Sequence, residues 1–148
     1  MTENLNLTSL YAMHPKILAP QGNEVPIGCD PGWYSLLDEL CSQLQHYTDE
    51  DNAPQVAAQQ IKTKFGGLRF YIGNAHPIQH ALIRFTESLS YRTCAICGGL
   101  GQLCEDNGVF STRCIAHAPA GSTPATPEEA SIRIVAWVPL NEVQKGEK

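Results

Sequence analysis

Two pairs of metal-binding side chains constrain the fold of this chain more than any other feature of its sequence. Cys94 and Cys97 have two residues between them, and Cys114 and His117, with the same spacing, follow after sixteen intervening residues. Each such pair can hold one ion from a tight turn, and a second pair about 10 to 20 residues later can complete a tetrahedral shell. Gly98 lets the backbone bend around the ion. Four sulfur and nitrogen ligands leave no open position, so the spacing predicts structural Zn²⁺ rather than a water-activating metal.

The six Cys residues of the chain do not all fit this site. A disulfide framework is disfavoured in a cytosolic protein, because reducing compartments keep thiols free. Cys104 is the main rival of His117 as the fourth ligand. Cys29 and Cys41 are interpreted as small hydrophobic residues, with a transient disulfide between them as the alternative. The alternative to a metal site is a set of buried thiols beside an incidental histidine.

The composition indicates one globular domain. Of its 148 residues, 43% are hydrophobic and 17% are charged, which suits a chain that buries a core. No apolar run approaches the roughly 20 residues that span a bilayer, and the first four residues lack the basic end of a signal peptide. The formal net charge of −5 argues against a protein that coats nucleic acid. We therefore expect a cytoplasmic protein without membrane contact.

Apolar spacing predicts two helices. The first begins at Asp30-Pro31, which supplies an N-cap acceptor and a proline for the first turn, and it ends near residues 46–48. The second covers residues 74–90, with Pro77 in its first turn. The apolar positions at helical spacing are Trp33, Leu36, Leu37, Leu40, Cys41 and Leu44 in the first helix, and Ile78, Ala81, Leu82, Phe85 and Leu89 in the second.

Residues 56–72 predict a β-hairpin. Gly66-Gly67 tolerates the positive φ angles of a two-residue turn. With that turn, one face is the core face and the other is basic and aromatic. The expected pairs on the second face are Lys64 with Arg69 and Lys62 with Tyr71, and the expected core face holds Ile61, Thr63, Phe65, Leu68, Phe70 and Ile72.

These elements predict an α+β fold, a small antiparallel sheet with two helices and a treble-clef-like zinc finger. Residues 1–28 are expected to be an irregular lead-in with a short strand near Ile17, and residues 29–117 to be the α+β zinc-binding domain. The small, proline-rich residues 118–129 predict a linker. Residues 130–148 carry a β-rich run that ends at a proline, followed by a tail. This run could add a strand to the hairpin or dock elsewhere.

No set of residues points to catalysis. His76 and His80 share one face of the second helix, but no glutamate accompanies them in the metalloprotease pattern. The glycine-rich residues 98–101 lack the lysine and hydroxyl of a phosphate loop. We therefore predict that the protein is not an enzyme, with a metal-dependent hydrolase as a remote alternative.

Charge is concentrated in the middle of the chain. Residues 62–113 carry a formal charge of +3, which leaves −8 on the rest. A basic centre in an acidic protein can attract an acidic partner or a phosphate backbone. The basic and aromatic hairpin face is the predicted partner-binding surface: Lys62, Lys64, Arg69 and Tyr71. The alternative partner is nucleic acid, whose phosphate backbone Arg92 and Arg113 would also contact. The alternative to both kinds of partner is that this face is an ordinary solvated surface.

Three strings occur together in residues 29–117: a Gly32-Trp33 helix start, the hairpin sequence Lys-Phe-Gly-Gly-Leu-Arg-Phe-Tyr at residues 64–71, and the Cys94–His117 finger. In this order the chain resembles a group of small uncharacterised proteins of phages and bacterial prophages. The resemblance supports the metal-ligand set and a cytosolic setting, and it implies no activity. We expect a non-catalytic phage accessory protein that binds a host or phage macromolecule and inhibits a host process.

Overall fold

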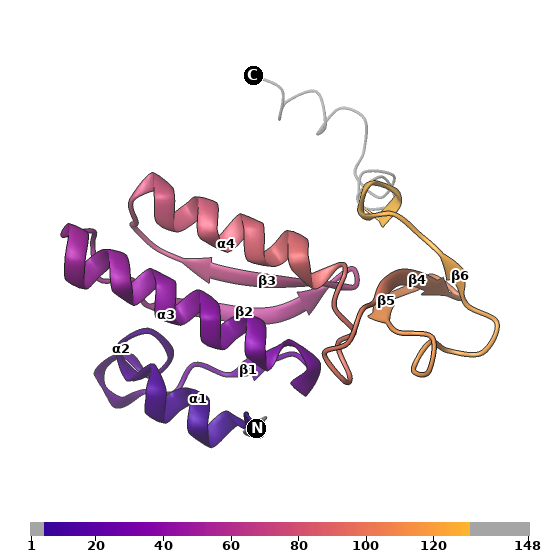
Figure 1. Cartoon of the computed structure of the whole chain (residues 1–148), viewed down its shortest axis with the longest axis horizontal. Helices are drawn as coiled ribbons and strands as arrows, with labels where there is room; N and C mark the ends of the chain where they lie inside the picture. Colours follow the sequence, from indigo (N-terminus) through magenta and orange to yellow (C-terminus); the bar gives the residue numbers. More distant parts are fainter. Residues whose placement is uncertain (1–4, 131–148) are drawn as a thin grey trace, which may run out of the picture.

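The first sheet forms around the predicted hairpin. The computed structural model describes residues 5–130, and this sheet has the order β1-β2-β3, with strands β1 (Ile27–Gly28), β2 (Ala58–Lys64) and β3 (Gly67–Ile72) (Figure 1). Strands β2 and β3 are antiparallel, as predicted, whereas β1 runs parallel to β2. The sheet is therefore mixed, and the prediction of a purely antiparallel sheet is wrong.

The hairpin turn lies one residue earlier than the sequence predicts. Phe65 and Gly66 occupy the two turn positions, with φ of 52° and 82°, and a type I′ turn requires positive φ at both. The predicted Gly66-Gly67 turn is wrong because Gly67 has another role. A Cβ atom there would lie 2.3 Å from Cζ of Tyr91, so only glycine leaves room for that ring.

The shift changes the pairing across the hairpin. Lys62 lies opposite Arg69, and Lys64 lies opposite Gly67. The predicted pairs of Lys64 with Arg69 and of Lys62 with Tyr71 are wrong. Because side chains alternate along each strand, all four predicted partner-binding residues still share the outer face of the sheet.

The long helix α3 (Tyr34–Asp51) covers the inner face of the sheet. It follows a 3-10 turn, η2 (Pro31–Trp33), and Asn52 ends it in the left-handed conformation, a little beyond the predicted end. The predicted apolar positions on this helix are mostly buried, and they pack with the sheet in one core: Trp33, Leu37, Leu40, Cys41 and Leu44 with Ile61, Leu68 and Phe70.

The second predicted helix is confirmed as α4 (Pro77–Ser90), but it does not bury its apolar side. Ile78, Phe85 and Leu89 are 38%, 64% and 36% exposed. The buried side is largely polar and consists of Gln79, Ile83, Thr86 and Ser90. Helical periodicity therefore identified the helix correctly, whereas hydrophobicity alone did not identify the face that it buries.

Hydrogen bonds fix α4 in this rotation. Its Ser90 hydroxyl accepts from the backbone N–H of Leu68 (2.9 Å), and the Glu87 carboxylate accepts from that of Phe70 (2.9 Å). Both N–H groups lie on the free edge of β3, which would otherwise expose unpaired donors. At the other end of the helix, the fully buried Gln79 amide donates to the carbonyl oxygens of Leu44 and Pro54 and to the Thr48 hydroxyl, at 3.2–3.3 Å.

The N-terminal segment is not the irregular lead-in that the sequence predicts. Helix α1 (Leu7–Met13), helix α2 (Pro15–Leu18) and a short turn η1 (Pro20–Gly22) precede β1, and Ile17 is helical rather than extended. This part of the chain contributes three side chains to the main core, each at most 1% exposed: Leu10, Ile17 and Leu18. Apolar spacing does not reveal these two helices, because both are very short and a proline begins the second.

The finger is a second, smaller sheet with the order β5-β4-β6, in which β4 (Gln102–Asp106) pairs with β5 (Val109–Arg113) and β6 (Thr123–Pro124). It has its own core of Leu103, Phe110, Ala125 and Ala130, with Tyr91 packed against it.

The predicted linker at residues 118–129 is therefore wrong, because part of it pairs with β4 and buries Ala125. The predicted C-terminal strand at residues 131–140, and the tail after it, lie outside the described residues. Within residues 5–130, no helix is both long and apolar enough to cross a membrane.

Candidate metal centre

The first ligand pair lies in a tight loop between α4 and β4. The Gly98 N–H donates to the Cys94 carbonyl (2.9 Å), and the Cys94 N–H donates to the Gly99 carbonyl (2.8 Å). A β-bridge between Thr93 and Leu100 closes the loop. Gly98 has a φ of 79°, as expected for the residue that lets the backbone turn back. We call this loop, residues 93–100, the knuckle.

The second pair follows β5 directly. The N–H groups of His117 and Ala118 both donate to the Cys114 carbonyl (3.1 and 2.9 Å), which closes a turn. The hairpin β4–β5 thus brings the two pairs together, although sixteen residues separate them in sequence.

The four ligand atoms lie at the distances that one tetrahedral metal ion requires. The Cys97 and Cys114 sulfurs are 3.8 Å apart, and Nδ1 of His117 lies 3.2 Å from the Cys114 sulfur and 3.7 Å from the Cys94 sulfur. All four atoms lie within 4.8 Å of one another. Sulfur ligands about 2.3 Å from a tetrahedral zinc ion are separated by about 3.8 Å. The cluster could therefore hold a metal ion.

The surroundings of Cys94 favour ionised sulfur, whereas hydrogen bonds with the Cys94 and Cys114 sulfurs raise the pKa of Cys97. Burial raises the pKa of Cys94, but backbone hydrogen bonds at Cys97, Cys114 and Ile96 outweigh it and lower the pKa to about 6. Thiolate is the form of cysteine that binds metal. Hydrogen bonds from backbone N–H groups to ligand sulfurs are part of the surroundings that position such ligands.

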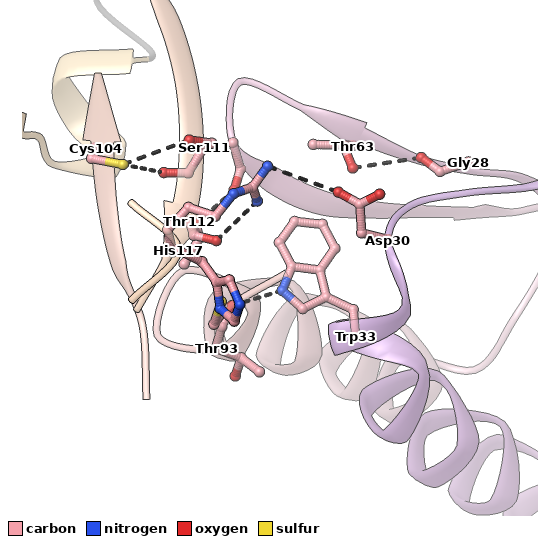
Figure 2. Close-up of polar contacts among 12 residues, drawn as sticks. Gly28, Asp30, Trp33, Thr63, Thr93, Cys104, Ser111, Thr112 and His117 are labelled. Atoms are coloured by element: carbon pink, nitrogen blue, oxygen red, sulfur yellow. Dashed lines mark hydrogen bonds and ion pairs between the residues drawn. The ribbon is translucent and has the colours of Figure 1, made fainter. Parts of the chain in front are cut away.

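The remaining cysteines have other environments. Cys104, the predicted rival of His117, is 5% exposed and donates to the Ser111 carbonyl across the hairpin at 3.2 Å (Figure 2). The cluster contains His117 and excludes Cys104. Burial raises the pKa of Cys29 to about 12 and raises that of Cys41 further, so both thiols stay protonated.

The knuckle is attached to the main core through the residues at the start of α3. The Gly32 N–H donates to the Ala95 carbonyl at 2.8 Å. The Trp33 indole donates to the Thr93 carbonyl, also at 2.8 Å (Figure 2). Trp33 is fully buried. The sequence predicted only a helix start here. The pair Gly32-Trp33 is the signal for this contact, because a residue without a side chain next to a large donor ring allows close approach of another backbone segment.

The finger is tied to the hairpin as well. The hydroxyl of Thr112 in β5 donates to the Gly66 carbonyl in the turn between β2 and β3 at 2.7 Å, and the Ala95 N–H donates to the Thr112 carbonyl at 3.0 Å. Arg113 forms an ion pair of 3.8 Å with Asp30 (Figure 2). The metal ligands, the hairpin turn and the start of α3 thus meet in one place.

The predicted partner-binding residues lie together on the outer face of the first sheet. Tyr71 is 37% exposed, and the Lys62 ammonium lies 5.8 Å from the centre of its ring. The Arg69 guanidinium lies over the Tyr91 ring and donates to its hydroxyl at 2.8 Å. Lys64 is exposed at the turn end of the same face.

Three hollows lie beside these residues, and each shares at least one lining side chain with the next. The first contains Lys62 and Tyr71, and the second contains Tyr71 and Arg69. The third, about 900 Å³ in volume, contains Arg69, Arg84 and Arg92. We call this feature the basic groove, lined among others by Lys62, Arg69, Tyr71, Arg84 and Arg92.

Few negative charges offset the basic groove. Its carboxylates are Glu87, which accepts from the Phe70 N–H, and Glu128. Within residues 5–130, the groove cations form no ion pair shorter than 4.0 Å. The groove therefore presents charge that an acidic ligand could neutralise.

His76 and His80 lie outside the cluster of possible metal ligands. His76 is the N-cap of α4, where its Nδ1 accepts from the Ile78 N–H at 3.2 Å. In the described part of the chain, one group of three or more His, Cys, Asp or Glu side chains could hold a metal ion, and it consists of Cys94, Cys97, Cys114 and His117.

Comparisons with protein-family models, with curated proteins and with solved structures found no match to this chain.

Proposed function

We propose that Cys94, Cys97, Cys114 and His117 hold one Zn²⁺ ion in a structural role. The observation that carries this proposal is the closed set of three sulfurs and one imidazole nitrogen within 4.8 Å of one another. Zinc takes such sets in structural sites. We further propose that the finger is treble-clef-like, which the order of a knuckle, a hairpin and a second ligand pair supports.

On this zinc-stabilised fold, we propose that the protein acts as a non-catalytic accessory protein of a phage or prophage. It binds an acidic segment of a host or phage protein in the cytoplasm and thereby inhibits a host process. The basic groove supports this proposal, because cations and the Tyr71 and Tyr91 rings line its neighbouring hollows and few carboxylates offset them. Lys62, Lys64, Arg69 and Tyr71 provide the first contacts, and Tyr and Arg are the residues that most often anchor protein interfaces.

Nucleic acid is the second candidate partner. Tyrosine rings and arginines follow one another along the basic groove, and proteins that bind single strands combine stacking platforms with a positive channel. Arg92 lines the groove, whereas Arg113 is paired with Asp30. A metal-dependent hydrolase stays a remote alternative, since His76 already serves as a helix cap.

Charge reversal in the groove tests the proposal. In a pull-down from host lysate, we expect Lys62→Glu and Arg84→Glu each to reduce capture of the partner about tenfold or more, because like charges at an interface cost several kcal/mol. Lys16→Glu is the matched control: it makes the same change in charge at an exposed position in α2 and should leave capture intact. A captured protein that resists nuclease and tolerates salt supports the first candidate.

Two results would contradict the proposal that the basic groove binds an acidic protein segment. Capture that disappears with nuclease and weakens steeply with salt would favour nucleic acid. Equal capture by Arg84→Glu, Lys62→Glu and Lys16→Glu would remove the basic groove from the contact surface.

A further inference from the structure

Three of the four large apolar side chains on one side of α4 are exposed, whereas the fourth, Leu82, packs partly against the main core. Ile78, Leu82, Phe85 and Leu89 are spaced by four, three and four residues, so they form one stripe along the helix. Phe85 is 64% exposed, the largest exposed fraction on this stripe. We call these four residues the α4 stripe. It lies on a different side of the helix from Arg84 and Glu87, which line the basic groove.

The helix cannot bury the stripe by rotating. Such a rotation would break the hydrogen bonds from Leu68 N–H to Ser90 and from Phe70 N–H to Glu87, and it would leave the buried Gln79 amide unsatisfied. Unsatisfied buried polar groups are costly. The exposure of the stripe is therefore a fixed property of the fold.

A second copy of the chain fits the stripe poorly. Taking roughly 200 Å² for a fully exposed large side chain, the exposed fractions add up to about 300 Å². A stable interface between separate proteins buries about 800 Å² on each side. A segment of the same chain needs less area, because its tether supplies a high effective concentration.

The chain offers a suitable segment. The described residues end at Ala130, which is 1% exposed in the core against which Tyr91 packs. Tyr91 is the C-cap of α4, so the chain leaves the finger next to the end of the helix at which the stripe finishes. Residues 132–138, Ile-Arg-Ile-Val-Ala-Trp-Val, follow almost at once and are apolar apart from the arginine.

Residues 132–138 are long enough to cover the α4 stripe. Eleven helical steps from Leu89 to Ile78 amount to about 16 Å, and an extended segment of seven residues spans about 23 Å. We infer that residues 132–138 dock along the α4 stripe and cover it in the monomer.

Trp137 provides a direct test in the full chain. The other tryptophan, Trp33, is fully buried, so iodide quenching of fluorescence measures the exposure of Trp137. We expect Trp137 to be protected from iodide, and Phe85→Ser to raise its quenching constant several-fold. Val109→Ser is the matched control, since Val109 is 67% exposed on the finger hairpin, and it should leave quenching unchanged.

A photo-cross-linking amino acid at position 85 identifies the occupant. The inference requires a cross-link to residues 131–148 of the same chain. A cross-link between two chains, no cross-link to this segment, or a Trp137 that is fully accessible in the unmodified protein would overturn it. Circular dichroism of each variant, together with its metal content, establishes that the fold is retained.

Discussion

Replacing Cys97 with serine is expected to abolish metal binding and to unfold the finger. Cys97 supplies one of four ligand atoms in a closed set, and its loss leaves a site with three protein ligands. Structural zinc contributes its binding free energy directly to folding. We expect the zinc content to fall from about one ion per chain to near zero, with a loss of more than about 3 kcal/mol in the free energy of unfolding.

Cys104→Ser is the control for this prediction. Cys104 is also a cysteine of the finger, but its sulfur faces Ser111 instead of the cluster. This variant should retain the full zinc content and lose about 1 kcal/mol of stability through its buried thiol. Elemental analysis and thermal unfolding, with and without chelator, provide both measurements. A metal-free preparation with unchanged thermal stability would show that the ion is not structural.

The features that were predicted correctly are those that depend on residues close together in the sequence. Two residues between ligands specify a turn, so the Cys94–Cys97 and Cys114–His117 pairs could be recognised without knowing the fold, and their ligand atoms do lie together. Both long helices and the hairpin were predicted from periodicity and turn residues for the same reason. The choice of His117 over Cys104 depends on which side of β4 faces the cluster, and residue spacing does not contain that information.

The predictions that were wrong concern places where two local conformations are both possible and contacts with distant residues select one of them. Gly66-Gly67 and Phe65-Gly66 can both form a two-residue turn, and the Tyr91 ring against Gly67 selects the second. The polar side of α4 is buried because it supplies acceptors to the edge of β3, a role that hydrophobicity does not reveal. The close approach of Gly32 to the knuckle joins segments about 60 residues apart, which no local pattern could show.

Gly32→Ala is expected to separate the knuckle from the main core without removing a metal ligand. A Cβ atom at position 32 would lie 2.2 Å from the carbonyl oxygen of Cys94 and 2.4 Å from the carbonyl carbon of Ala95. Both are backbone atoms of the tight loop that holds the metal ligands, so no side chain can rotate away to relieve the overlap. The loop must move, which breaks the hydrogen bond from Gly32 to Ala95 and strains that from Trp33 to Thr93.

We therefore expect Gly32→Ala to reduce the free energy of unfolding by about 3 kcal/mol or more, which is a fall of roughly 10 °C in Tm for a chain of this size. Gly73→Ala is the control, because a Cβ there meets only the flexible end of Gln59 at 3.1 Å, and its effect should stay within about 1 kcal/mol. Zinc content should remain near one ion per chain in both variants, since all four ligands are present. A Gly32→Ala protein as stable as Gly73→Ala would mean that the knuckle does not pack against the start of α3. A large loss of stability with the metal retained would instead show that the finger stabilises the fold through this contact as well as through its ion.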